Sequence, residues 1–181
     1  MKSLHSALIA TAVILGSVSI LTAPDAFAAG SSKPAKDEAK KCKRGEIYSE
    51  RREKCVRDDS AGLTSDERYE TGRAFAFDGR FEDALLALAS ADQDDPRVLN
   101  YMGYSSRKAG RLDEGMRFYE AALALDPDFA LARSYMGQAL LQQGDREAAE
   151  AQLAQIAAIT GTRSANYLQL RDALRKGRSR Y

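Results

Sequence analysis

Apolar residues recur at steps of three and four along most of the chain after Thr64. Two such runs are Leu85, Leu88 and Ala91, and Met116, Tyr119 and Leu123. This spacing puts the apolar residues on one face of a helix, so it predicts amphipathic helices rather than strands. We expect the first helix to begin after Thr64, because Thr64 followed by Glu67 is the pattern of a capping box.

The helical segment also repeats itself three times. Pairs of glycines, each pair seven residues apart, mark the copies as Gly72 and Gly79, Gly103 and Gly110, and Gly137 and Gly144. Similar heptads follow the second glycines: GRFEDAL, GRLDEGM and GDREAAE. We expect the first glycine to let one helix approach a small residue on the next. The second glycine should end the first helix in the left-handed conformation. A β-branched residue is strained there, so we expect Gly110→Val to unfold much of the repeat region.

These marks resemble the tetratricopeptide repeat, a helical hairpin of about 34 residues. The resemblance covers residues 65 to 163, as copies 65–95, 96–129 and 130–163 within a repeat region of 64–163. It implies an all-α fold, a right-handed α-solenoid of about three hairpins. A capping helix over 164–176, with Tyr167, Leu170 and Leu174 on one face, and a basic tail over 177–181 should follow.

The spacing of the copies is uneven. Gly72 and Gly103 are 31 residues apart, whereas Gly103 and Gly137 are 34 apart. We expect the shortfall to lie between Pro96 and Gly103, with Asp95 capping the helix and Pro96 at its first position. The packing angle between the first two repeats therefore stays open.

The N-terminus has the order of a secretory signal over residues 1–28. Lys2 precedes an apolar stretch from residue 7 to 23, and Ala26-Phe27-Ala28 has the small residues of a cleavage site. Cleavage after Ala28 would export the chain to the periplasm or the exterior and leave no membrane span. The alternative, an uncleaved anchor, stays open.

Between the signal and the repeats lie three short segments. Residues 29–41 are small and charged, which predicts disorder, and residues 57–63 are expected to form a linker. The chain has two cysteines, Cys42 and Cys55, and in an oxidising compartment such a pair indicates a disulfide. We expect a disulfide-closed hairpin over 42–56, appended to repeats that keep their helices when it is reduced.

Charge and composition exclude several classes of function. Residues 60–170 hold eleven Lys and Arg against seventeen Asp and Glu, which is not the footprint of a nucleic-acid binder. The single histidine, His5, lies in the signal, so the exported chain would lack imidazole for catalysis or metal binding. We expect no metal site, no cofactor and no enzymatic activity.

The resemblance implies a partner-binding inner groove formed by the outward side of each first helix. The matching positions are Tyr69, Arg73, Phe77, Asn100, Tyr104, Arg107, Lys108 and Gln138, beside Ser134 and Leu141. Exposed aromatic residues next to arginines are typical of a surface that binds a protein or peptide. Arg73, Tyr104 and Arg107 should be exposed and contribute most. The alternative for Phe77 and Leu141 is that they complete the core.

Two functions follow from these features. The first is a non-catalytic protein-binding or peptide-binding scaffold in the periplasm or outside the cell, acting in envelope assembly. The second is a surface-associated structural protein whose basic ends attach to anionic envelope polymers, since residues 171–181 hold five Lys and Arg against one Asp. The sequence names neither the partner nor the oligomeric state.

Overall fold

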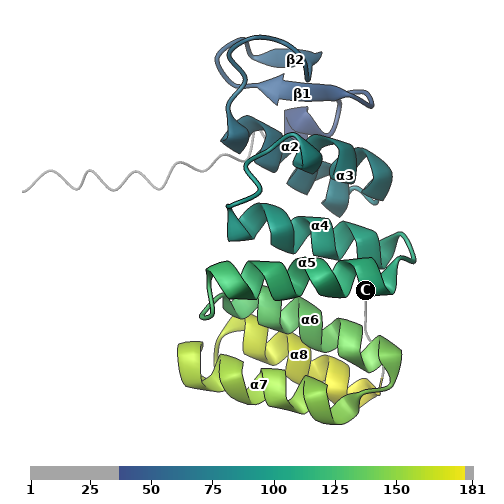
Figure 1. The fold of residues 1–181 in the computed structure, drawn as a ribbon, viewed down its shortest axis with the longest axis vertical. Coiled ribbons are helices and arrows are strands. Elements are labelled where there is room, and N and C mark those ends of the chain that lie inside the picture. The colour runs from purple at the N-terminus through teal and green to yellow at the C-terminus, as the bar shows by residue number, and fades with distance from the viewer. Residues whose placement is uncertain (1–36, 178–181) are drawn as a thin grey trace, which may run out of the picture. The chain divides into compact units, whose positions relative to one another are not determined.

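The computed structural model describes residues 37–177, which form a short two-stranded hairpin followed by helices (Figure 1). The expected signal, residues 29–36 and residues 178–181 lie outside the described residues. The helices are α2 (Ser65–Phe77), α3 (Phe81–Ala89), α4 (Pro96–Lys108), α5 (Leu112–Leu125), α6 (Ala130–Gln143), α7 (Arg146–Thr160) and α8 (Ala165–Lys176). Successive helices pack against each other, and α4 also contacts α2 and α6. This mostly helical structure fits the helical repeat that the sequence predicts.

The ends of the helices follow the predicted local chemistry. The Thr64 side chain accepts a hydrogen bond from the Glu67 amide, and the Glu67 carboxylate accepts one from the Thr64 amide, which completes the capping box. Asp95 caps α4 with Pro96 at its first position. Gly110 and Gly144 have φ of +86° and +84°, so both stand in the left-handed conformation that a returning chain requires.

The first glycine of each pair lies against a neighbouring helix. A Cβ at Gly72 would lie 2.6 Å from Leu88 of α3, and one at Gly103 would lie 2.7 Å from Tyr119 of α5. In the third copy a Cβ at Gly137 would meet Leu170 of α8, at 2.5 Å. In the third copy the side chain nearest to this glycine therefore comes from the capping helix α8, although α7 also packs on α6.

The shorter spacing of the first two copies reflects where the proline stands. Both α4 and α6 begin seven residues before their glycine, but Pro96 is the first residue of α4, whereas Pro127 stands three residues before α6. Gly103 follows Pro96 by 7 residues, whereas Gly137 follows Pro127 by 10, so the shortfall in the sequence falls after Pro96 as expected. In the structure α3 is also short, with 9 residues where α5 has 14, because it ends at Ala89 and a longer loop leads to Asp95.

The strands β1 (Glu46–Ser49) and β2 (Lys54–Arg57) pair antiparallel, with Tyr48 opposite Cys55. The predicted disulfide is present between Cys42 and Cys55, whose Cα atoms are 5.4 Å apart. A sheet of two strands buries little apolar surface, so a covalent bond is a reasonable support for it. The disulfide joins the segment before β1 to the outer strand β2.

The hairpin is part of the helical core rather than an appendage. Ile47 is only 1% exposed and belongs to one apolar cluster with Phe75 and Leu88. Two amides of the β1 segment donate to α2, from Tyr48 to the Thr71 hydroxyl at 3.0 Å and from Glu50 to the Glu67 carboxylate. The side chains of α2 thus satisfy the edge of β1, which would otherwise expose unpaired backbone groups.

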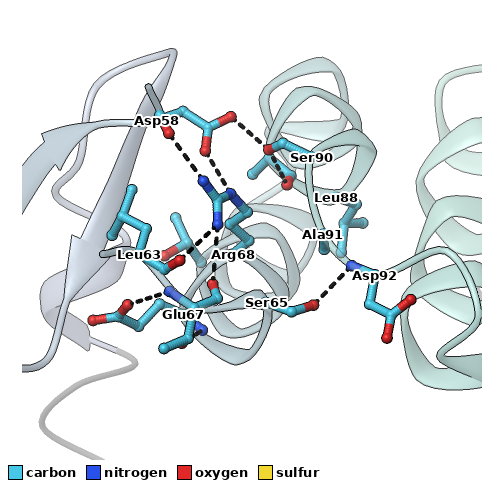
Figure 2. Close-up of polar contacts among 12 residues, drawn as sticks. Asp58, Leu63, Ser65, Glu67, Arg68, Leu88, Ser90, Ala91 and Asp92 are labelled. Carbon is cyan, nitrogen blue, oxygen red and sulfur yellow. Dashed lines mark hydrogen bonds and ion pairs between the residues drawn. The ribbon is translucent and has the colours of Figure 1, made fainter. Parts of the chain in front are cut away.

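A polar junction fastens the segment between hairpin and repeats (Figure 2). The Arg68 guanidinium donates to the Asp58 carboxylate at 2.8 Å and to the Leu63 carbonyl at 3.0 Å. The Ser90 hydroxyl at the end of α3 donates to the same carboxylate. Asp58 therefore ties the chain before α2 to the chain after α3.

Before the hairpin, residues 37–39 form a helical turn in which Ala39 is buried, so packing begins within the segment for which disorder is expected.

Candidate functional site

The predicted inner-groove residues lie on three helices that contact one another. Tyr69, Arg73 and Phe77 stand on α2. Asn100, Tyr104, Arg107 and Lys108 stand on α4, and Gln138 stands on α6. The structure thus brings residues from three repeats onto adjacent first helices, as the resemblance implies.

Their aromatic rings form one connected set, here called the aromatic cluster: Tyr69, Phe77, Tyr101, Tyr104 and Tyr135. Tyr69 and Tyr101 have ring centroids 5.9 Å apart, and Phe77 lies 5.6 Å from Tyr101. Tyr104 bridges to the third repeat, at 5.2 Å from Tyr135. Edge-to-face and tilted ring pairs of this kind add stability beyond the area that they bury. The cluster therefore makes a rigid aromatic wall across α2, α4 and α6.

Exposure within this wall differs from the expectation. Phe77 is 51% exposed, so the alternative that it completes the core is wrong, whereas Leu141 is partly buried against the apolar cluster of α6, α7 and α8. Tyr104 and Arg107 are buried, the latter to 4% exposure, and Arg73 is half-buried. The expectation that Arg73, Tyr104 and Arg107 are freely exposed is wrong. Arg73 and Tyr104 lie against rings of neighbouring repeats, and Arg107 lies against Tyr104 and Tyr119 of its own repeat.

Three cations stand over aromatic rings: Arg73 and Arg107 over rings of the aromatic cluster, and Lys108 over Phe81, which lies outside it. The Arg73 guanidinium lies 5.1 Å from the Phe77 ring centroid and donates a hydrogen bond to the Tyr101 hydroxyl at 3.0 Å. Arg107 lies 5.7 Å from the Tyr104 centroid. The Lys108 ammonium lies 5.6 Å from the Phe81 centroid. The ring faces attract these charges and hold them in place at the surface of the cluster.

The surroundings of Lys108 on α4 disfavour its charged form. Burial, and then the neighbouring charge of Arg107, lower the pKa of Lys108 below its ordinary value. Both causes disfavour the charged ammonium. Burial likewise raises the pKa of the Tyr119 hydroxyl, which accepts a hydrogen bond from Arg107, to about 12. The tyrosine hydroxyl therefore stays neutral at ordinary pH.

Several buried polar side chains of α4 and α6 have atoms without a hydrogen-bond partner in the described structure. Asn100 is 0% exposed, and neither atom of its amide has a hydrogen-bond partner in the described structure. Ser134 and Gln138 of α6 are also buried; the Gln138 amide nitrogen donates to the Ser134 carbonyl, while its oxygen has no partner. Such atoms cost free energy, so their clustering on first helices distinguishes this wall from an ordinary core.

A pocket of about 330 Å³ opens at the aromatic cluster, lined by Phe77, Tyr104, Tyr135 and Gln169. The four residues come from α2, α4, α6 and α8. Sequence reasoning missed Tyr101, Tyr135 and Gln169. A signal for two of them was present, because Tyr101 and Tyr135 each stand two residues before the first glycine of their copy. Gln169 belongs to the capping helix, which has no counterpart among the copies.

The site offers side chains that can contact a bound partner. Its polar groups are cations, amides and tyrosine hydroxyls on rigid helices. Within residues 37–177, no cluster of three or more His, Cys, Asp or Glu could hold a metal ion. In the same part of the chain, no helix is both long and apolar enough to cross a membrane.

Comparison with known families identifies the repeats. Residues 106–174, from the end of α4 into α8, match the model of the tetratricopeptide repeat. This match confirms the resemblance to the tetratricopeptide family over a stretch that holds Gly110, Gly137 and Gly144, and does not extend to the first copy. Repeats of this family suggest a scaffold for protein–protein interaction. No curated protein matches the chain.

Proposed function

We propose that this protein, which carries tetratricopeptide repeats, is a non-catalytic scaffold that binds a protein or peptide on the wall formed by α2, α4 and α6. The repeats would continue as a right-handed α-solenoid with that wall on its inner side. The observation that carries the proposal is Phe77, an aromatic side chain 51% exposed at the mouth of a pocket. A large apolar group held in water beside Arg73 is the kind of anchor that dominates binding at interfaces.

The place of action that we propose is the periplasm or the cell exterior, with a role in envelope assembly. The signal pattern of residues 1–28 and the Cys42–Cys55 disulfide both support an oxidising compartment. Cell fractionation with a tag after Tyr181 tests it. Recovery of the protein from the cytosol with free thiols would contradict this part of the proposal.

The binding function is tested by capture from envelope extract with two matched variants. Phe77→Ala removes the exposed ring at the pocket. Leu125→Ala removes a side chain of similar exposure, 49%, from α5. We expect Phe77→Ala to weaken binding of the captured partner by roughly 1 to 3 kcal/mol and Leu125→Ala to have no effect. Both should change the free energy of unfolding by only about 0.5 kcal/mol. Equal capture by both variants would refute a binding wall at Phe77.

A structural protein attached through its basic ends is the second candidate. Arg171, Arg175 and Lys176 near the end of α8 favour it. Salt separates the two functions, because exposed charges are screened within about 8 Å at physiological ionic strength. Release from the envelope at high salt, unchanged in Phe77→Ala, would favour the structural role.

A further inference from the structure

The pocket at the aromatic cluster has an uncharged lining. Phe77, Tyr104 and Tyr135 supply three aromatic rings, and Gln169 of α8 supplies one side-chain amide. Burial raises the pKa of the Tyr135 hydroxyl above its ordinary value, so the phenol stays neutral. The volume of about 330 Å³ lies at the lower end of the range for small-molecule sites, about 300 to 1,000 Å³. The pocket is therefore suited to one compact unit of a ligand.

Two polar groups of the lining are available to a ligand. Tyr135 is only 6% exposed, and within residues 37–177 neither its hydroxyl nor the Gln169 amide makes a hydrogen bond. An apolar ligand would separate these groups from water without replacing its hydrogen bonds, which costs free energy. A phenol and an amide can each both donate and accept. The ligand should therefore carry neutral groups that donate and accept hydrogen bonds.

The charges next to the pocket disfavour charged ligands. The Arg73 guanidinium lies 5.1 Å from the Phe77 ring centroid, and that of Arg107 lies 5.7 Å from the Tyr104 centroid. These cations would repel a cationic ligand held between the same rings. Neither arginine lines the pocket, so an anionic ligand would lose its water without gaining a direct ionic partner. Charge therefore favours an uncharged ligand.

The rings supply the apolar contact for such a ligand. Phe77 is 51% exposed, and its centroid lies 6.2 Å from that of Tyr104, which in turn lies 5.2 Å from that of Tyr135. The face of an aromatic ring is negative and attracts the weakly positive hydrogens of C–H groups. A sugar ring has C–H groups on its faces and hydroxyls around its edge. An acetamido group on the sugar adds an amide that can pair with the Gln169 amide.

We infer that this pocket binds a neutral, N-acetylated sugar unit of a glycan. One face of the sugar packs on the Phe77 ring, with the rings of Tyr104 and Tyr135 beside it. The Tyr135 hydroxyl and the Gln169 amide form hydrogen bonds with the polar edge. The inference goes beyond the proposed function, because the ligand is a saccharide rather than a protein. The lining residues come from α2, α4, α6 and α8, so the site requires the capping helix to be packed on the repeats.

The probe is chitotetraose, a neutral oligomer of N-acetylglucosamine, measured by ligand-observed NMR and calorimetry on the full chain purified with its disulfide intact. Its deacetylated counterpart has the same rings but carries a cationic amine in place of each acetamido group. N-acetyltyrosine amide offers an aromatic ring and a hydroxyl without a sugar. We expect chitotetraose to bind and each of the other two to bind roughly tenfold more weakly. Equal or tighter binding of either one would overturn the inference.

Single substitutions locate the saccharide in the pocket. Tyr135→Phe removes the hydroxyl and keeps the ring, and Gln169→Ala removes the amide. Each should weaken chitotetraose binding roughly fivefold, the effect of one neutral hydrogen bond. Tyr167→Phe is the matched control, since it removes a hydroxyl from α8 outside the pocket. Affinity that is unchanged in both pocket variants, or reduced as much in the control, would overturn the inference.

Capture of a protein partner separates the inference from the proposed function. If chitotetraose does not bind while Phe77→Ala still weakens protein capture, the inference is overturned and the scaffold function stands. If chitotetraose binds in a way that depends on Tyr135 and Gln169 while protein capture is the same in Phe77→Ala, the inference stands and the proposed binding wall is refuted.

Discussion

Gly103 of α4 and Gly115 of α5 bring the backbones of the two helices into direct contact. A Cβ at Gly115 would lie 2.8 Å from the Gly103 carbonyl oxygen, and one at Gly103 would lie 3.0 Å from the Gly115 carbonyl oxygen. Neither backbone can move without shifting its helix. The contact therefore requires glycine on both sides, and it sets the distance between the helices that hold Tyr104 and Tyr119.

We predict that Gly115→Ala destabilises the protein by about 1 to 3 kcal/mol through this overpacking. The sign of this change in the free energy of unfolding is diagnostic, because alanine in a helix is otherwise favoured over glycine by about 1 kcal/mol. Gly137→Ala is the comparison, because the nearest neighbours of a Cβ there are side-chain atoms of Leu170 rather than backbone atoms. Denaturant unfolding of both variants measures the difference, and a stabilised Gly115→Ala would show that α4 and α5 separate easily.

Backbone conformation makes a second glycine position testable. Gly110 has φ of +86°, and a Cβ there would meet no atom within 4 Å. Gly110→Val should cost about 2 kcal/mol or more from strain, whereas Gly110→Asn should cost much less, because asparagine tolerates the left-handed region. Thermal melting by circular dichroism compares the two. Equal melting temperatures would mean that the turn adopts another conformation in solution.

Reduction of the disulfide should weaken the first repeat. Cys42 and Ile47 belong to the same apolar cluster as Phe75, so opening the loop loosens packing on α2. We expect a loss of about 3 kcal/mol in the free energy of unfolding, the usual value for a loop of this size. Hydrogen exchange should accelerate in α2 and change little in α7. If the protection of α2 from hydrogen exchange is the same before and after reduction, the hairpin is an appendage of the repeats.

The buried amide of Asn100 is expected to lower stability. Because neither of its polar atoms has a partner in the described structure, Asn100→Leu should raise the free energy of unfolding by about 1 kcal/mol. Asn100→Ala, which leaves a cavity, should not. If leucine stabilises the fold but weakens peptide binding, the amide serves the ligand. Destabilisation by leucine would instead mean that the amide is satisfied in solution.

Processing of the N-terminus gives the simplest measurement. The exported protein should begin at Ala29 or Gly30, because Ala26 and Ala28 provide the small residues that signal peptidase recognises. Intact-mass spectrometry of the protein from the envelope fraction decides it. A mass that includes Met1, found with the membranes, would establish the uncleaved anchor.

The sequence by itself determined the features that depend on local chemistry. Helix starts at Thr64 and Asp95, left-handed turns at the second glycines and the pairing of Cys42 with Cys55 each follow from a few neighbouring residues or a compartment rule. The repeat could be recognised because the glycine pairs and the heptads that follow them recur. Their period is a property of the chain before any packing is known.

Only the tertiary structure decided which of these residues a partner can reach. Tyr104 and Phe77 occupy similar outward positions, yet Tyr104 is buried between rings from two other repeats while Phe77 remains half exposed. Likewise, Leu170 of the capping helix takes the place at Gly137, and this brings Gln169 of the same helix to the pocket. The exposure of a side chain depends on other side chains far away in the sequence. A helical period therefore predicts the face on which a residue lies but not how deeply the residue is buried.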